Sequence, residues 1–383
     1  MFDTIISNIT DFLLMLRLAD VLDIVIVAYL FYKLSSLVRE TRAGTLIKGI
    51  ILLLIFTWIS NTLQLNTINY LLKNLYTSFI CFIVSLPICI YHFYQVNFLS
   101  IILNIIMIPL VSIIVFPLTL ITFFFPFIYD IYIVAINILE TINMLASNIN
   151  IFTINLMKPS FIIIIIYYIT IMLTLINFKY TIFLLILIIF HKYYIYFKKE
   201  FLITMIDVGQ GDSLLITIPN NKSNILIDTG GIISYNNEEW QQRKNNYSIA
   251  QDKIITYLKS LGINKLNYLI LTHGDYDHMG EAINLVNTLK VEKVIFNCGP
   301  YNELEKELIK TLDKKKIQYY SCIKELNIDN NKLYFLQTKE YDNENDNSNV
   351  IYTELNGYKF MFMGDASTTT EKEILNKYNL PNI

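Results

Sequence analysis

The chain is poor in charged residues, and over its first half it is also poor in glycine. Charged types make up only 16% of its 383 residues and hydrophobic types 54%, whereas soluble domains carry about 25% charged residues. Residues 1–200 hold 11 basic and 8 acidic side chains, and only two of the twelve glycines, Gly44 and Gly49, precede Gly209. This composition excludes a chain that is soluble throughout. We expect an apolar front followed by a soluble body of domain size.

The soluble half lacks an excess of basic residues. Residues 201–383 contain 19 basic and 24 acidic side chains, so they carry no electrostatic footprint for nucleic acid, which calls for a basic face. The short run Lys314-Lys315-Lys316 is predicted to be the solvated end of a helix rather than a phosphate-binding patch.

Cysteine is scarce, with four in the whole chain. Cys81 and Cys89 lie in apolar segments, and Cys298 and Cys322 do not have the CxxC spacing of a metal knuckle. The sequence therefore predicts neither a zinc knuckle nor a disulfide framework.

The front half does contain long apolar runs. A helix needs about 20 mainly apolar residues to cross the hydrocarbon core. Pro109, Pro117 and Pro126 interrupt the pattern, so the helices there are either broken around a polar cavity or simply kinked where they pack. We expect a multi-pass protein of the cell membrane, with candidate spans at 21–37, 45–65, 77–96, 101–118, 121–135, 160–175 and 181–197.

Basic residues gather between the first two candidate spans, at Lys33, Arg39, Arg42 and Lys48. The positive-inside rule places such a loop in the cytoplasm and Met1 outside. The side of the membrane that bears the soluble half depends on the number of later spans, which the sequence leaves open.

Two groups of segments in the membrane half each carry a family resemblance. The first group is Asp20-Val21-Leu22-Asp23-Ile24 and Arg39-Glu40-Thr41-Arg42-Ala43, and the second is Ser85-Leu86-Pro87 and Tyr91-His92-Phe93-Tyr94-Gln95. With the first group, the stretch 1–77 resembles the membrane anchor of CdaA-type diadenylate cyclases, although no cyclase domain follows it. With the second, residues 78–200 are similar to the late membrane region of ComEC-type DNA-internalisation (competence) proteins. We expect either a natural fusion or the product of a mis-assembled gene, joined near Thr77.

The soluble half, 201–383, alternates between strand-like and helix-like patterns. This order suits helices packed on the outer faces of two sheets. The polar stretches 236–246 and 342–349 are predicted to be exposed loops. Strands are predicted at 201–206, 213–218, 224–228, 267–271, 292–296, 317–320, 332–336, 349–355 and 358–363, and helices at 248–261, 279–289, 302–313 and 369–378.

A dense group of potential metal ligands follows the strand that ends at Leu271. The run is Thr272-His273-Gly274-Asp275-Tyr276-Asp277-His278-Met279-Gly280. Imidazoles and carboxylates together suit Zn²⁺ and also harder ions such as Mn²⁺. The alternative, in which both histidines are ordinary helix-cap and surface residues, explains less of the pattern.

Three Asp/Gly clusters stand where other strands stop, and alone each would read as a plain turn. Together with the histidine run they predict a site built at strand ends, where loops are anchored yet open to solvent. The clusters are Asp207-Val208-Gly209-Gln210-Gly211-Asp212, Asp228-Thr229-Gly230-Gly231 and Gly364-Asp365.

This motif set is similar to the metallo-β-lactamase family, and within it to the soluble domain of the same ComEC-type proteins. The resemblance implies an αββα sandwich with two divalent metal ions, Zn or Mn. It places His273 and Asp275 on the first metal, Asp277 and His278 on the second, and Asp365 between them. Asp277 would then also orient the nucleophilic water as the catalytic residue.

The family also supplies a later histidine, in a His-His-Gly-Ser element that does not occur before Ile383. The other two histidines, His92 and His191, stand in apolar surroundings and are expected to be packed or interfacial. We therefore expect a C-terminally incomplete domain with an exposed sheet edge and reduced metal affinity, since even an outer-shell loss costs about 10–100-fold.

The resemblance implies a membrane component of DNA uptake that carries a phosphodiesterase or nuclease-type domain, impaired by truncation. Its expected partners are DNA (a single strand in transit or the degraded strand), membrane lipids, and other competence proteins or further copies of the chain. The alternative is a non-catalytic fusion or mis-assembled membrane protein. A diadenylate cyclase activity is not expected, because no nucleotide-binding catalytic domain follows the anchor-like stretch.

Overall fold

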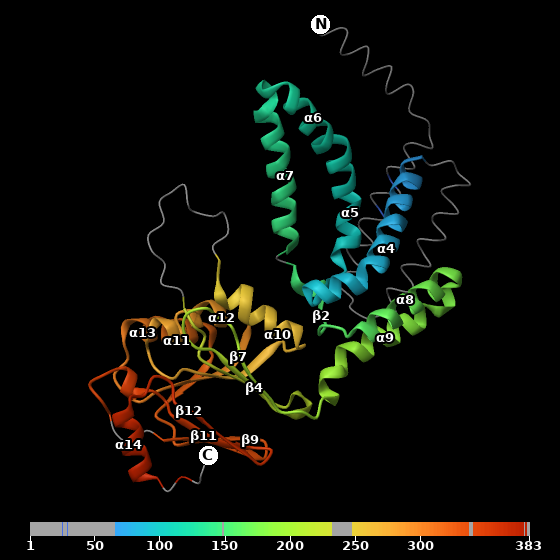
Figure 1. The fold of residues 1–383 in the computed structure, drawn as a ribbon. Coiled ribbons are helices and arrows are strands. Elements are labelled where there is room, and N and C mark those ends of the chain that lie inside the picture. Colours follow the sequence, from blue (N-terminus) through green and yellow to red (C-terminus); the bar gives the residue numbers. More distant parts are fainter. Residues whose placement is uncertain are drawn as a thin grey trace. The chain divides into compact units, whose positions relative to one another are not determined.

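The computed structural model describes residues 66–147, 149–231, 247–336 and 340–378, together with Val25, Tyr29 and Leu380. The chain divides into two compact units (Figure 1), one made of residues 1–86 and 97–153 and the other of 87–96 and 154–383. Most of the stretch 1–77, the basic loop after the first candidate span and the predicted loop 236–246 lie outside the described residues.

The first unit is built of apolar helices. Pro109 lacks an N–H, so one hydrogen bond to the preceding turn is missing there, and a widened π-helical turn, η1 (Leu110–Val115), follows directly. The helix is therefore distorted at the prolines rather than broken, and it ends only at Phe125, before Pro126. The elements are α4 (Asn66–Phe93), α5 (Leu99–Pro109), η1, α6 (Phe116–Phe124), η2 (Pro126–Ile128), α7 (Tyr129–Ser147) and η3 (Asn150–Phe152).

Four helical stretches of the described chain are long and apolar enough to cross a membrane. Large apolar side chains lie on their surfaces, such as Phe123 at 81% and Phe127 at 82% exposed. Such a surface is unfavourable in water and favourable in lipid. The apolar helices predicted from composition are present, at Leu72–Phe93, Leu99–Phe124, Pro126–Ser147 and Phe178–Phe197, with a shorter one at Phe161–Ile176. The predicted span 121–135 is wrong, because one helical stretch ends at Phe124 and the next begins at Pro126, both inside that range.

The second unit contains a helical hairpin. Tyr167 and His191 are buried within it, and the tyrosine hydroxyl lies 3.1 Å from His191 Nδ1. His191 is thus a packed histidine, as expected. The elements here are α8 (Phe161–Ile176), η4 (Phe178–Tyr180), α9 (Thr181–Tyr193) and η5 (Tyr194–Phe197); two short strands, β1 (Gln95–Asn97) and β2 (Thr153–Asn155), pair where the division between the units falls in the sequence.

Two sheets follow. The first has the order β3-β4-β5-β6-β7-β8, antiparallel from β3 to β5 and parallel from β5 to β8. The second has the antiparallel order β12-β11-β10-β9. The strands are β3 (Leu202–Met205), β4 (Leu214–Thr217), β5 (Asn224–Ile227), β6 (Lys265–Ile270), β7 (Lys290–Phe296), β8 (Gln318–Ser321), β9 (Glu325–Ile328), β10 (Asn331–Phe335), β11 (Ile351–Leu355) and β12 (Tyr358–Phe362).

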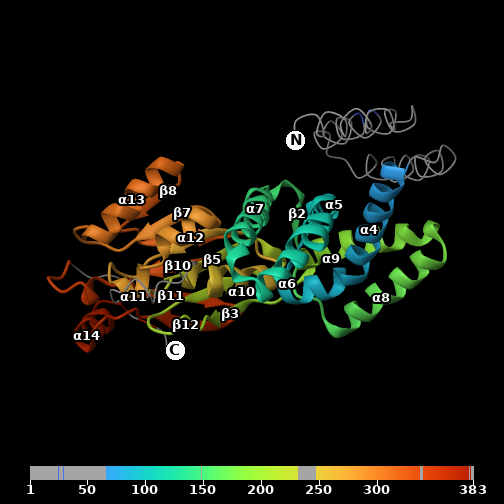
Figure 2. The ribbon, with the colours of Figure 1, turned by 90° about the horizontal axis from the view of Figure 1, so that it is seen from above.

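Alternate residues of the first sheet enter two different cores. Ile216 and Ile270 pack with Leu333 and other residues of the second sheet, whereas Leu269 packs with helix residues such as Leu308. This period-two alternation gives two stacked sheets with helices outside, the αββα arrangement that we predicted (Figure 2). The helices are η8 (Ala250–Ile255), α10 (Thr256–Ser260), α11 (Tyr276–Met279), α12 (Ala282–Thr288), α13 (Glu303–Lys315) and α14 (Thr368–Lys377), with a short turn η6 (Pro219–Asn221).

Candidate metal centre

The ligand-rich run lies at the carboxyl end of a buried parallel strand. β6 ends at Ile270, the chain turns through 271–275, and α11 begins at Tyr276. β5 ends next to it, and Asp228 follows in the left-handed conformation at φ 58°. Adjacent parallel strands bring the residues after their carboxyl ends to one edge of the sheet.

Three of the predicted ligands converge there. One ligand atom each from His273, His278 and Asp365 lies within 4.8 Å of the other two. His278 Nε2 is 3.3 Å from Asp365 Oδ1. The centroids of the His273 and His278 rings are 4.2 Å apart. Asp365 comes from the turn after β12, so the site joins the first sheet to the second.

His273 presents a free donor atom to this group. Its Nε2 is buried and has no hydrogen-bond partner in the part of the chain that the structure describes, and the nearest carboxylate oxygen, Asp275 Oδ2, is 3.5 Å away. A buried nitrogen without a partner is costly. A divalent cation held by this nitrogen and by the neighbouring Asp365 would satisfy it, so the donor set fits a metal of the zinc or manganese type.

Asp228 and Thr272 orient the two imidazoles from behind. Asp228 accepts hydrogen bonds from Thr272 N at 2.8 Å and from the Thr272 hydroxyl at 2.6 Å, and its Oδ2 lies 3.0 Å from His278 Nδ1. With its proton on Nδ1, His278 donates to this carboxylate and keeps the Nε2 lone pair for a metal. Likewise, His273 Nδ1 lies within hydrogen-bond distance of a side-chain oxygen, Thr272 Oγ1, at 3.1 Å.

The electrostatic field of the carboxylates around His278 favours a positive charge in the site. Burial by itself lowers the pKa of His278, but the hydrogen bond and charge of Asp228, with the charges of Asp365 and Asp277, raise this pKa from 6.5 to about 9. The same carboxylates would stabilise a bound cation, which at neutral pH must displace the proton that His278 holds.

Two glycines of the Asp/Gly clusters, Gly211 and Gly231, lie very close to the backbone of α11. A Cβ on Gly211, at φ 90°, would lie 1.7 Å from Asp277 O, and one on Gly231 would lie 2.0 Å from Tyr276 O. The two glycine loops can therefore press on the backbone of α11 and hold the ligand helix in place.

The remaining predicted ligands are placed less centrally. Asp275 lies beside His273 but is outside the converging group found among the described residues, and so is Asp277. Asp277 acts on His278 through its charge, and its backbone packs under Gly211.

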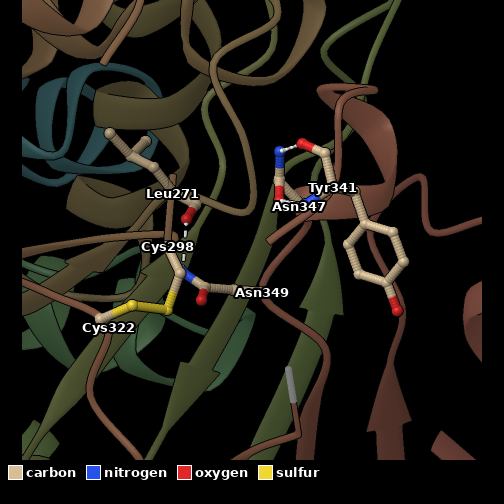
Figure 3. The surroundings of a disulfide bond; sticks show 6 residues. All are labelled: Leu271, Cys298, Cys322, Tyr341, Asn347 and Asn349. Atoms are coloured by element: carbon tan, nitrogen blue, oxygen red, sulfur yellow. Dashed lines mark hydrogen bonds between the residues drawn. A yellow bond between two sulfur atoms is a disulfide. The ribbon is translucent and has the colours of Figure 1, made fainter. Parts of the chain in front are cut away.

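The sequence reading missed the segment 344–349, which it treated as an exposed loop. Asn347, Ser348 and Asn349 are in fact 1–2% exposed. Ser348 Oγ lies 3.3 Å from His273 Nδ1 and accepts a hydrogen bond from Asp365 N at 3.3 Å. Asn349 N donates to Thr272 O at 2.8 Å, and its side chain donates to Leu271 O (Figure 3). A run of short polar residues directly before a buried strand was the available signal.

The expectation of no disulfide is wrong. Cys298 follows β7 and Cys322 follows β8, and because these strands are paired and parallel, the two sulfurs meet in a disulfide (Figure 3). Spacing along the chain could not show this, since the contact depends on the strand pairing.

The fold is that of an α/β domain of the metallo-β-lactamase type, preceded in the chain by apolar helices long enough to cross a membrane. Residues 206–381 match the family described as "Metallo-beta-lactamase superfamily", and residues 46–180 match the family described as "Competence protein". The second match begins inside the stretch 1–77 that resembles a cyclase anchor. The chain is similar to ComE operon protein 3 of Bacillus subtilis (strain 168), with 27% identity over 321 residues, 78% of this chain; it spans 41% of that relative's length.

Solved structures that are similar to this chain match only about half of it. CmlA, a diiron β-hydroxylase from Streptomyces venezuelae, matches 46% of this chain and 33% of its own at 13% identity and a TM-score of 0.30. A possible metal-dependent hydrolase from Veillonella parvula DSM 2008 matches 48% of this chain and 69% of its own at 17% identity, also with a TM-score of 0.30. Scores this low carry no argument about function.

Proposed function

We propose that this chain is a multi-pass component of DNA uptake in the cell membrane, of the ComEC type, whose soluble half is a metal-dependent phosphodiesterase or nuclease. The observation that carries the proposal is the convergence of His273, His278 and Asp365 at one edge of a domain that follows apolar helices. The match of 46–180 to the competence family supports the link to DNA.

In this proposal the site holds two divalent ions, Zn or Mn. His273 and Asp275 serve the first, Asp277 and His278 the second, and Asp365 both. Bound ions would supply Lewis-acid chemistry to a phosphodiester and a water. Asp277 orients the attacking water, Asp228 fixes the proton of His278 on Nδ1, and Thr272 orients His273.

The substrate in this proposal is the phosphodiester backbone of the strand that is not imported, while the other strand passes the membrane region. The surrounding lipid, other competence proteins and further copies of the chain are the remaining partners. Since residues 201–383 are not basic overall, the bound ions themselves would provide much of the attraction for phosphate.

The test uses the full chain purified in detergent with Zn²⁺ or Mn²⁺ added. We expect bound metal and cleavage of single- or double-stranded DNA, both strongly reduced in Asp365→Asn. Asp329→Asn, which changes an exposed carboxylate paired with Lys222, is the matched control and should behave as the parent. A chain that binds metal but leaves DNA intact would overturn the nuclease proposal and point to another hydrolase.

The resemblance of 1–77 to a cyclase anchor forms a separate part of the proposal. Sequencing one transcript across Thr77 checks it: a continuous message supports a natural fusion. Two separate messages would show that the chain joins two genes.

A further inference from the structure

The peptide groups of Gly274 are held from two sides. Gly274 stands between His273 and Asp275, two of the candidate ligands. The Asn302 side chain donates through Nδ2 to Gly274 O at 2.7 Å, and Gly274 N donates to Glu344 Oε1 at 2.8 Å. Side chains therefore bind both backbone polar groups of Gly274, its N–H and its carbonyl oxygen.

Asn302 and Glu344, the two residues that bind the Gly274 peptide, lie in connections of different sheets. Asn302 precedes α13, which follows β7 of the first sheet. Glu344 precedes the short turn η9 (Asn345–Asn347), between β10 and β11 of the second sheet. The ligand loop is therefore fastened to both halves of the sandwich.

The fit around Gly274 is tight. A Cβ there would lie 2.1 Å from Asn302 Nδ2 and 2.8 Å from Glu344 Oε1. Any larger residue would push both side chains away from the peptide, so glycine is required for this contact.

Each holding residue is itself fixed. Asn302 Oδ1 accepts from Glu305 N at 2.9 Å and Glu305 Oε2 accepts from Asn302 N at 2.8 Å, a reciprocal capping box. Behind Glu344, the Asn347 side chain accepts from Tyr341 N at 2.9 Å and donates to Tyr341 O at 2.7 Å (Figure 3). The Asn302 side chain is thus ordered before a ligand binds, and the turn that bears Glu344 is held by Asn347, whose N–H donates to Glu344 O at 3.0 Å.

We propose that Asn302 and Glu344 are positioning residues that clamp the Gly274 peptide and thereby set the affinity of the site for a divalent cation. The inference rests on the proposed function, because it takes the site to be a metal site. A loop that is already ordered loses less conformational entropy on binding, and partners of this kind typically change metal affinity by about 10–100-fold.

Three variants separate clamping from folding. Asn302→Ser keeps a good helix cap but cannot reach Gly274 O. Glu344→Ala removes the acceptor for Gly274 N, and Glu344→Gln retains an oxygen that can accept the same hydrogen bond. Glu307→Gln changes an exposed carboxylate on α13 and controls for the loss of charge.

Two measurements on the full chain in detergent decide the matter. The first is the affinity for Mn²⁺ or Zn²⁺ by titration; we expect it to be about tenfold weaker in Asn302→Ser and Glu344→Ala, and close to the parent in Glu344→Gln and Glu307→Gln. The second is hydrogen–deuterium exchange of the metal-free protein, in which the peptide containing Gly274 should exchange faster in the first two variants, with an unchanged unfolding midpoint.

Parent-like affinity in Asn302→Ser and Glu344→Ala overturns the proposal, and so does unchanged exchange at Gly274. A parent chain that binds no divalent cation overturns the proposed function together with the claim about affinity. A chain that binds metal normally but cuts no DNA leaves the clamp supported and removes only the nuclease activity.

Discussion

Asp228 Oδ2 lies 3.0 Å from His278 Nδ1, and both side chains are almost fully buried. The aspartate comes from the turn after β5 and the histidine from α11, 50 positions later. Because Asp228 also accepts two hydrogen bonds from Thr272, one buried carboxylate ties the strand ends to both imidazoles of the site. This pair fixes the side of His278 that faces the candidate metal.

Asp228→Asn should weaken metal binding by about 10–100-fold, the usual effect of losing such a partner. The amide can still accept from Thr272, but an amide N–H facing His278 Nδ1 favours the wrong tautomer. Titration of the full chain with Zn²⁺ or Mn²⁺ measures the effect, with Asp329→Asn as the exposed control. Equal affinity in the variant and the parent would show that the carboxylate does not set the tautomer.

Gly211→Ala should destabilise the domain much more than Gly209→Ala. Both glycines have positive φ, at 90° and 85°, so each substitution costs about 1–2 kcal/mol in backbone strain. Only the Gly211 variant also collides with Asp277 O, while nothing lies within 4 Å of a Cβ on Gly209; overpacking adds about 1–3 kcal/mol. Thermal unfolding of the two variants side by side measures the difference. Equal losses would mean that the loop does not press on α11.

Glu305 should make stability depend on pH near neutrality. Burial is the main cause that raises the pKa of this carboxyl from 4.5 to about 7, although the hydrogen bond from Asn302 N opposes it and the charge of Glu344 adds to it. Since the folded protein holds the proton more tightly than the unfolded chain, this contribution is complete below pH 4.5 and is lost as the pH rises through about 7. Glu305→Gln should therefore flatten this part of the stability curve, while Glu307→Gln should leave it as it is.

The Cys298–Cys322 disulfide should stabilise the domain against unfolding. It closes a loop with a sequence separation of 24 residues, for which chain entropy gives about 3.5 kcal/mol. Replacing both cysteines with serine should lower the unfolding midpoint, and a reductant should then have no further effect. Cys81→Ser, a change at a free exposed cysteine, is the control. Alkylation of Cys298 and Cys322 in the native, unreduced chain would contradict the disulfide.

Much of the architecture was predictable from local pattern. Long apolar runs are unfavourable in water and predicted the apolar helices, and short strand-like runs predicted every strand of the first sheet. β9 (Glu325–Ile328) was missed although Leu326 and Ile328 alternate with polar residues, because a run of only four residues is a weak local signal. Pro109 and Pro117 were recognised as interruptions, but only the structure distinguished a distorted helix from a broken one.

The candidate site divides in the same way. The sequence by itself determined the ligand types and their local spacing, because His273 to His278 are six consecutive residues that span the turn after β6 and the start of α11. Only the tertiary structure decided that Asp365 joins the two imidazoles, that Asn302 and Glu344 meet at Gly274, and that Cys298 reaches Cys322. Each of these contacts joins residues that are distant in the sequence, and strand pairing and sheet stacking bring them together, which no local pattern of side chains encodes.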